Sequence, residues 1–263
     1  MESKRFVAVL LPLITLILSG CTEMNEPVTS ESPGIWNEFV VYPLSWLIIN
    51  IAGLFGHPWG YGMAIMIVTV LIRLLILPLA VKQIKSSKAM HMIQPELEKL
   101  RQKYSSKDAV TQQKLQEEQL LLLQKYDINP MAGCLPVLVQ MRILIGFYHA
   151  IMRTEEIKGN AFLWFELSSP DPYYILPALA GLLTYFQQKV LMIGQPGNPQ
   201  TAMMLWMMPL MIVIFSLFLP AALPLYWIVG NIFTIIQSYF IKIPVAPLAE
   251  TEQAASLTGG KKK

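Results

Sequence analysis

The sequence predicts an all-α integral membrane protein with five transmembrane helices, a cytoplasmic antiparallel helical hairpin and an N-terminal interfacial amphipathic helix. Two observations predict this class. Hydrophobic residues make up 54% of the 263 residues, charged residues make up only 14%, and the mean hydropathy is +0.47. Soluble domains carry about 25% charged residues, so a conventional soluble globule is excluded. The basic residues also gather in one polar stretch between apolar blocks, where they can set orientation in a membrane.

Other classes are excluded by the same composition. Two cysteines are too few to hold a disulfide scaffold of this size. The net charge of +3 is too small to indicate a nucleic acid as partner. What matters in a membrane protein is the position of the charge along the chain, because it sets the topology.

Residues 1–20 are expected to be a lipoprotein signal peptide that is cleaved before Cys21. Lys4 and Arg5 precede an apolar run from Phe6 to Leu18, which is the pattern of a secretory signal. The run ends in Leu-Ser-Gly-Cys, which resembles a bacterial lipobox whose cysteine thiol carries a diacylglyceryl group. Two acyl chains anchor firmly, since each buried CH₂ contributes about 0.8 kcal/mol. An uncleaved first transmembrane helix is the alternative.

Four apolar blocks supply the five spans: Tyr61–Val81, Leu135–Met152, Tyr173–Ile193 and Ala202–Ile241. A helix of about 20 apolar residues crosses roughly 30 Å of hydrocarbon. The last block is about twice that length and contains Pro220 and Pro224, which predict two spans with a tight turn between them. Residues 58–242 are thus expected to form the five-helix core, and residues 243–263 a cytoplasmic tail.

Charge fixes the predicted orientation. Residues 82–127 contain nine Lys and Arg, whereas residues 153–172 contain two, against four acidic residues. The first loop is therefore assigned to the cytoplasm and the second to the outside. If Cys21 lies outside the bacterial plasma membrane, one span must separate it from residue 82, and Tyr61–Val81 is that span. Residues 33–57 are consequently predicted to lie in the outer interface, with the C-terminus of the protein in the cytoplasm.

Residues 83–128 are predicted to form the helical hairpin. Apolar residues recur there at spacings of three and four on both sides of a polar turn, as in an antiparallel coiled coil. The predicted seam comprises Met90, Ile93, Leu97, Leu100 and Tyr104, followed by Leu115, Leu122 and Tyr126. Pro95 is expected to kink or restart the first helix. A solvated charged loop is the alternative.

Arg73 is the most informative residue of the predicted spans. It lies twelve residues after Tyr61, or roughly 18 Å deep at 1.5 Å per residue. An arginine at mid-helix costs about 2.5 kcal/mol or more in a bilayer, and no acidic residue occurs in any of the five spans. A cation without a counter-ion at that depth implies water, and hence a hydrated cavity. An arginine paired inside the bundle for structural reasons is the alternative.

Further polar residues are predicted at the same level of the bundle, in the inner half of the bilayer: Gln140, Gln187, Gln188, Trp227, Asn231 and Gln237. Each glutamine by itself also fits a hydrogen bond between helices. Together with Arg73 they predict a groove that is open to the cytosol and closed toward the outside, because a pore would need polar residues along its whole length.

The sequence contains no constellation for catalysis or metal binding. Its three histidines are scattered, and neither an HExxH motif nor a Walker A motif occurs. We therefore expect no enzyme, no metal and no cofactor. A small polytopic solute transporter or channel is the alternative function, although transporters usually show paired repeats and midplane charges for ion coupling.

Four features carry a resemblance: Arg73, the hairpin, Asn129–Pro136 at the start of the second span, and the stretch from Pro224 to Gln237. Together they resemble the YidC membrane protein insertase family, in its short SpoIIIJ-like lipoprotein form from Gram-positive bacteria. The resemblance implies an insertase and chaperone for nascent membrane proteins, and for lipoproteins, that needs no nucleotide hydrolysis. It implies that substrates leave between the third and fifth spans. The implied partners are nascent chains, the lipid bilayer, the Sec translocon and the ribosome, although the short tail argues against strong autonomous ribosome binding.

Overall fold

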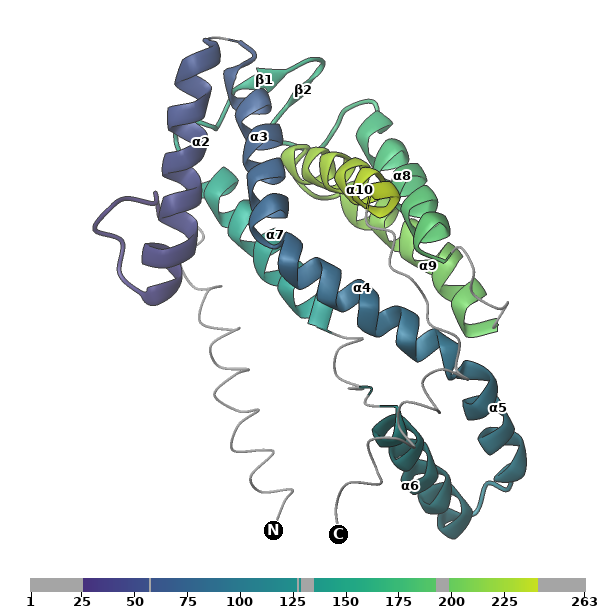
Figure 1. Cartoon of the computed structure of the whole chain (residues 1–263). Coiled ribbons are helices and arrows are strands. Elements are labelled where there is room, and N and C mark those ends of the chain that lie inside the picture. Colours follow the sequence, from purple (N-terminus) through teal and green to yellow (C-terminus); the bar gives the residue numbers. More distant parts are fainter. Residues whose placement is uncertain (1–25, 57, 127, 129–134, 193–198, 241–263) are drawn as a thin grey trace.

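The computed structural model describes residues 26–56, 58–126, 128, 135–192 and 199–240, and these are almost entirely helical (Figure 1). The predicted signal peptide, Cys21 and the tail 243–263 lie outside the described residues. The helices are η2 (Asn37–Val41, a π-helix), α2 (Tyr42–Phe55), α3 (Gly60–Leu75), α4 (Leu77–Met92), α5 (Gln94–Lys103), α6 (Ala109–Lys125), α7 (Leu135–Arg153), α8 (Ile175–Leu191), α9 (Pro199–Ser216) and α10 (Ala222–Phe240). Two short antiparallel strands, β1 (Ala161–Phe162) and β2 (Phe165–Glu166), lie between α7 and α8.

The predicted span Tyr61–Val81 is divided between α3 and α4. The axes of Gly60–Leu75 and Leu77–Ser86 differ by 59° at Ile76. Pro78 explains the bend, because proline lacks an amide proton and its ring clashes with the carbonyl four residues earlier. Helix α4 then continues to Met92, so the helical region of the predicted loop begins well before Met90.

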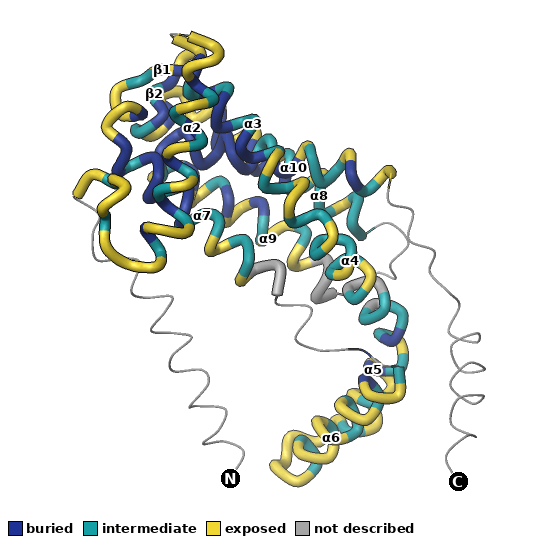
Figure 2. Tube along the Cα trace, turned by 60° about the vertical axis from the view of Figure 1, so that its left-hand side comes forward, coloured by how far each residue is buried: buried dark blue, intermediate teal, exposed yellow. Residues whose placement is uncertain are grey.

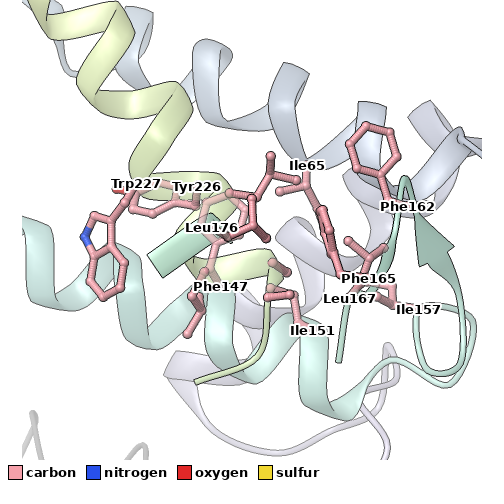
Figure 3. Packing of buried hydrophobic residues seen from close by; sticks show 14 of the residues in the cluster. Ile65, Phe147, Ile151, Ile157, Phe162, Phe165, Leu167, Leu176, Tyr226 and Trp227 are labelled. Atoms are coloured by element: carbon pink, nitrogen blue, oxygen red, sulfur yellow. The ribbon is translucent and has the colours of Figure 1, made fainter. Parts of the chain in front are cut away.

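Helices α3, α7, α8 and α10 share one apolar core. Ile65 of α3, Phe147 of α7, Leu176 of α8 and Tyr226 of α10 are all buried there, as the close-up in Figure 3 shows. The β1–β2 segment closes one end of this core with Phe162, Phe165 and Leu167. The core therefore lies at the level of the N-terminal halves of α3, α8 and α10 and the C-terminal half of α7.

Helices α9 and α10 divide the long apolar run as the two prolines predicted. Helix α9 ends at Ser216 and α10 begins at Ala222, so Pro220 lies in the turn, whereas Pro224 lies in the first turn of α10. A first-turn proline is tolerated because the amide of that position has no helical acceptor. Helices α8 and α9 pack closely, with Gly181 against the side chain of Val213.

Length and composition single out Asn37–Phe55 as the one described helix that could cross a membrane by itself, and the bent pair Gly60–Leu75 and Leu77–Ser86 as a second candidate when taken together. Asn37–Phe55 is the helical part of the segment predicted to lie in the interface. It packs along α3 and crosses the C-terminal end of α7, where Val40 and Leu44 lie against Gly146. Both the interfacial position and the count of five spans stay predictions.

Helices α5 and α6 lie side by side, apart from the core, and most of their surface is exposed (Figure 2). Their contact buries Ile93, Leu97, Leu123 and Ile128. Pro95 lies in the first turn of α5, so it restarts the helix. Asp108 caps α6 by accepting a hydrogen bond from the Thr111 amide at 2.9 Å. The Ser106 hydroxyl and Thr111 hold the pKa of Asp108 well below its usual range.

Candidate functional site

Arg73 lies in the last turn of α3 and faces α10. Its guanidinium carbon is 5.8 Å from the centre of the Tyr226 ring. The guanidinium also lies directly on the backbone of Gly230, since a Cβ at that position would come within 2.5 Å of an Arg73 terminal nitrogen. Tyr226 and Gly230 are four residues apart and therefore share one face of α10. That face holds the cation between an aromatic ring and a position without a side chain.

The charge of Arg73 is not neutralised by the described part of the protein. No described carboxylate forms an ion pair with it, and its buried Nε has no hydrogen-bond partner among these residues. The structure thus agrees with the absence of acidic residues from the predicted spans. A guanidinium is always charged and offers five N–H donors, so this position has donor capacity that an incoming acceptor can use.

Gln140 joins the same site from α7. Its Nε2 donates a hydrogen bond to the Tyr226 hydroxyl at 3.0 Å. Tyr226, which is only 1% exposed, contacts both Arg73 on α3 and Gln140 on α7, and so it connects the two residues. The structure therefore brings two of the predicted site residues together through a third residue that the sequence analysis did not select.

Asn231 and Trp227 occupy a different face of α10. The Asn231 amide donates to the Thr184 hydroxyl of α8 at 2.8 Å, and that hydroxyl donates to the Ala180 carbonyl at 2.7 Å. Both Asn231 and Trp227 are buried, and Trp227 belongs to the core cluster (Figure 3). In this conformation, then, the Asn231–Thr184 hydrogen bond joins α10 to α8.

The remaining predicted site residues lie farther along α8 and α10. Gln187 and Gln188 are half-buried, one turn after Thr184. Gln237 is buried and its Nε2 has no partner among the described residues, as is also true of Nε2 of Gln83 on α4. These unpartnered nitrogens and Arg73 Nε are all donors, so what they lack is an acceptor such as a carboxylate, a peptide carbonyl or water.

The opposite end of the helices is covered by the segment between α7 and α8. Asp171 is buried, accepts the Leu176 amide at 2.6 Å and accepts the Trp164 indole at 3.0 Å, which fixes the start of α8. The Ala221 and Ala222 amides donate to carbonyls of Ser169 and Leu167 at 2.8 and 3.1 Å. These hydrogen bonds tie the starts of α8 and α10 together over buried apolar residues of the core.

Comparison with known proteins decides the family. A family model described as "60Kd inner membrane protein" matches residues 51–246. Membrane protein insertase MisCA of Bacillus subtilis (strain 168) is 55% identical over 263 residues, which cover 99% of both chains. Membrane protein insertase YidC 2 of Bacillus anthracis is 54% identical over 264 residues and the full length of both chains. The chain belongs to the YidC membrane protein insertase family.

A solved structure of the YidC family supports this assignment. The crystal structure described as "Active YidC insertase crystal structure with the first transmembrane domain resolved" superposes with a TM-score of 0.62 at 25% sequence identity. The match covers 80% of this chain and 47% of that chain, so this chain spans about half the length of that structure. The predicted family is confirmed, and membership implies an integral protein of the bacterial cell membrane.

Two residues at the centre of the site were missed by the sequence analysis, which selected Trp227 and Asn231 in preference to Tyr226 and Gly230. A signal for them does exist. Tyr226, Gly230 and Gln237 recur at spacings of four and seven and thus form one stripe on α10. Which of the two neighbouring stripes faces Arg73 depends on the rotation of α10 about its axis, and that rotation is not encoded by the spacing.

Proposed function

We propose that the protein is a membrane protein insertase and chaperone that receives nascent membrane proteins, and lipoproteins, in a hydrophilic groove around Arg73. The groove is open to the cytosol and to lipid, and its work needs no nucleotide hydrolysis. The observation that carries the proposal is the set of buried donors without acceptors, on Arg73 and Gln237, combined with a cover over the opposite end of the helices. Relatives named membrane protein insertases support this function and not a solute transporter or channel.

The first step is capture of a short translocated segment. An acidic segment is attracted by the Arg73 guanidinium, which has no described counter-ion. The peptide carbonyls of the translocated segment would otherwise lose their water in the bilayer, at a cost of several kcal/mol for each unpaired group. Gln140, Gln187, Gln188 and Gln237 are the donors that satisfy them. The groove therefore replaces the hydration of the segment while it crosses the inner half of the membrane.

The second step is release of the apolar segment into lipid, between α8 and α10, the third and fifth spans. Transfer of apolar surface out of water drives it. The membrane potential adds about 2.3 kcal/mol per charge for each 100 mV. In the structure the Asn231–Thr184 hydrogen bond joins these two helices. We propose that this contact opens for the passing segment and closes after it.

The topology belongs to the same proposal. The five spans are α3 with the start of α4, then α7, α8, α9 and α10. The N-terminus is outside and lipid-anchored at Cys21, and the C-terminus is in the cytoplasm of a bacterial plasma membrane. Segment 33–57 lies in the outer interface, and the α5–α6 pair projects into the cytosol, where it first meets the nascent chain. The Sec translocon and the ribosome are the proposed further partners.

Photo-crosslinking of a stalled, single-spanning nascent chain tests the proposal. One probe replaces Gln187, which is half-buried on α8, and a control probe replaces Leu210, which is 60% exposed on α9. We expect crosslinks at Gln187 that disappear once the chain is released, and few at Leu210. A stable, correctly oriented protein without crosslinks at Gln187 would refute the groove and make a solute-transport assay the next measurement.

A further inference from the structure

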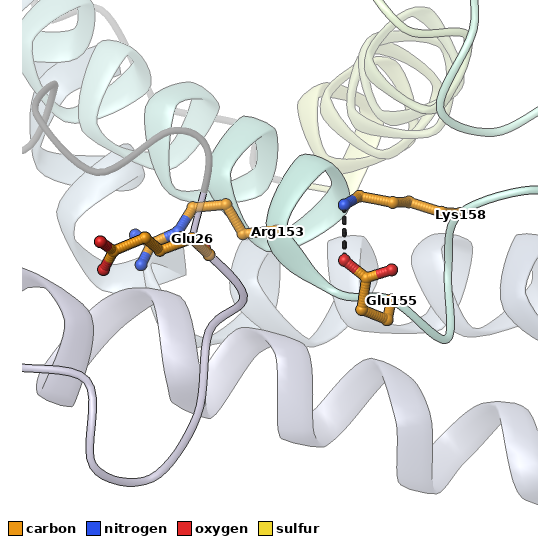
Figure 4. A network of polar contacts seen from close by, with 4 residues as sticks. All are labelled: Glu26, Arg153, Glu155 and Lys158. Atoms are coloured by element: carbon orange, nitrogen blue, oxygen red, sulfur yellow. Dashed lines mark hydrogen bonds and ion pairs between the residues drawn. The ribbon is translucent and has the colours of Figure 1, made fainter.

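Arg153 at the C-terminal end of α7 holds the first described segment of the chain, residues 26–33, which we call the strap. The Arg153 side chain donates from Nε to the Glu26 carbonyl at 2.8 Å and from Nη1 to Oδ1 of Asn37 at 2.8 Å. The Arg153 carbonyl in turn accepts the Val28 amide at 2.9 Å. Figure 4 shows the Arg153 side chain reaching from α7 toward Glu26. One residue thus binds the strap through both its side chain and its backbone.

The strap has local structure of its own. The Thr29 amide donates to the Ser32 hydroxyl at 3.0 Å, and the Ser32 amide donates to the Thr29 carbonyl at 3.2 Å. The Asn37 side chain then donates to the Pro33 carbonyl at 2.6 Å. These bonds turn the chain back toward η2. The strap is therefore fixed at both ends, by Arg153 at its start and by Asn37 where η2 begins.

The burial of Arg153 makes its hydrogen bonds important for stability. The residue is only 2% exposed, and a buried guanidinium is costly unless its donors are satisfied. The neighbouring cation shows the opposite case: Lys158 pairs with Glu155 at 2.7 Å, with 42% and 62% of the two side chains exposed (Figure 4). Such an exposed pair contributes little. The buried arginine thus joins the strap and η2 to the end of α7.

Resting on the proposed lipidation of Cys21, we infer that Arg153 positions the lipid anchor, so that its acyl chains enter the bilayer beside η2. Cys21 precedes Glu26 by five residues, and five residues at about 3.5 Å each span at most about 17 Å. Within that reach, Ile35 and Phe39 are 70% and 68% exposed and lie four residues apart. These two exposed side chains form an apolar surface. We propose that the acyl chains on Cys21 of the same protein cover it, because the short segment between Cys21 and Glu26 keeps them nearby.

The position of the acyl chains beside η2 keeps them away from the proposed substrate exit. In both Figure 1 and Figure 2, α2, which directly follows η2, lies on one side of the molecule and α8 on the other. An anchor held at η2 keeps its acyl chains away from the α8–α10 contact, through which substrates are proposed to leave. An anchor free to diffuse around the protein would compete with substrate for the lipid beside that contact.

The test uses the full-length protein in cells fed a fatty acid that carries a photoactivatable diazirine. After irradiation, the residues that the acyl chain labels are mapped by mass spectrometry. We expect labelling concentrated on residues 35–44. In Arg153→Gln this labelling should fall about tenfold, the effect of losing a charge-assisted hydrogen bond, whereas Lys158→Gln, which removes an exposed cation from the loop that follows α7, should leave it unchanged.

Three results would overturn the inference. Labelling of the wild-type protein spread evenly over α8 and α9 would do so without any variant, even if Arg153→Gln failed to fold. Unchanged labelling of residues 35–44 in a folded Arg153→Gln protein would show that Arg153 does not position the anchor. Protein without any incorporated fatty acid would remove the lipid anchor and this inference with it, while nascent-chain crosslinks at Gln187 would still support the insertase.

Discussion

Among the described residues, Arg73 and Arg153 are the arginines with buried guanidinium atoms, and the structure satisfies the two side chains differently. Arg153 is almost fully buried, and Glu26 and Asn37 accept its hydrogen bonds. Arg73 is half-buried against Tyr226 and Gly230, and its Nε has no partner among the described residues. A satisfied guanidinium holds protein segments together. A guanidinium with an unused donor can accept a new partner, and we propose that for Arg73 this partner is a substrate.

The largest effect is expected from Arg153→Ala on stability. The variant leaves the Glu26 carbonyl and the Asn37 side chain without the donor that they have now. Asn37 is buried, whereas Glu26 is exposed and water can replace the lost donor there. An unsatisfied buried polar group costs about 1–3 kcal/mol, so we expect the free energy of unfolding to fall by about 1–3 kcal/mol. Thermal unfolding of the purified protein in detergent measures this. A melting temperature equal to that of the wild type would show that Arg153 is not a structural residue.

Arg73→Ala should lower the insertion activity and leave the stability of the protein nearly unchanged. The variant removes an attraction to acidic translocated segments, and we expect their insertion to fall about tenfold, equivalent to roughly 1.4 kcal/mol, while the melting temperature stays close to that of the wild type. Arg73→Lys should retain part of the activity because it keeps the charge. Insertion of substrates with acidic and neutral outer segments into proteoliposomes provides the measurement. If Arg73→Ala and the wild type inserted acidic substrates equally well, the proposed attraction between Arg73 and acidic segments would be refuted.

Gly230→Ala should have a smaller effect on the same assay. The new Cβ would lie 2.5 Å from a terminal nitrogen of Arg73 and 3.0 Å from its Nε. The flexible guanidinium must shift, so insertion of acidic substrates should fall several-fold, by less than in Arg73→Ala, without loss of the fold. Gly53→Ala is the matched control, because no atom lies within 4 Å of its added Cβ. Identical activity of the two glycine variants would show that the Arg73 position is not critical.

Lys158→Gln should have the smallest effect. Its ion pair with Glu155 is exposed, and such pairs contribute about 0–1 kcal/mol. We expect the melting temperature and the insertion of acidic substrates to remain within error of the wild type. A loss of stability as large as that of Arg153→Ala would mean that exposure does not distinguish the contributions of Arg153 and Lys158, and the comparison of buried and exposed cations would fail.

The order of the helices follows closely from the sequence. Apolar blocks predicted α7, α8, α9 and α10, because each must bury or expose to lipid a long apolar surface. Pro220 predicted the turn between α9 and α10, and Pro95 predicted the restart at α5. The bend at Ile76 was missed, although Pro78 causes it, because hydropathy runs unbroken from α3 into α4.

The composition of the site was also accessible from the sequence, in part. Arg73 stood out because a charge in an apolar span is rare and costly, and Gln140 because it is polar in such a span. Tyr226 and Gly230 cannot be singled out in this way, because an aromatic residue and a glycine are common in membrane helices. Their importance comes from Arg73, which lies 153 positions before Tyr226 in the chain and reaches it through packing of α3 on α10.

The sequence by itself determined that this protein is helical, belongs to a membrane and holds a cation inside its bundle, since these properties depend on composition and local spacing. Tertiary structure alone decided the partners of each polar group. It turned Asn231 toward Thr184, Gln140 toward Tyr226 and Arg153 toward the strap. The physical reason is that hydropathy is a property of each residue, whereas satisfaction of a donor depends on which acceptor the packing of distant helices brings within about 3 Å.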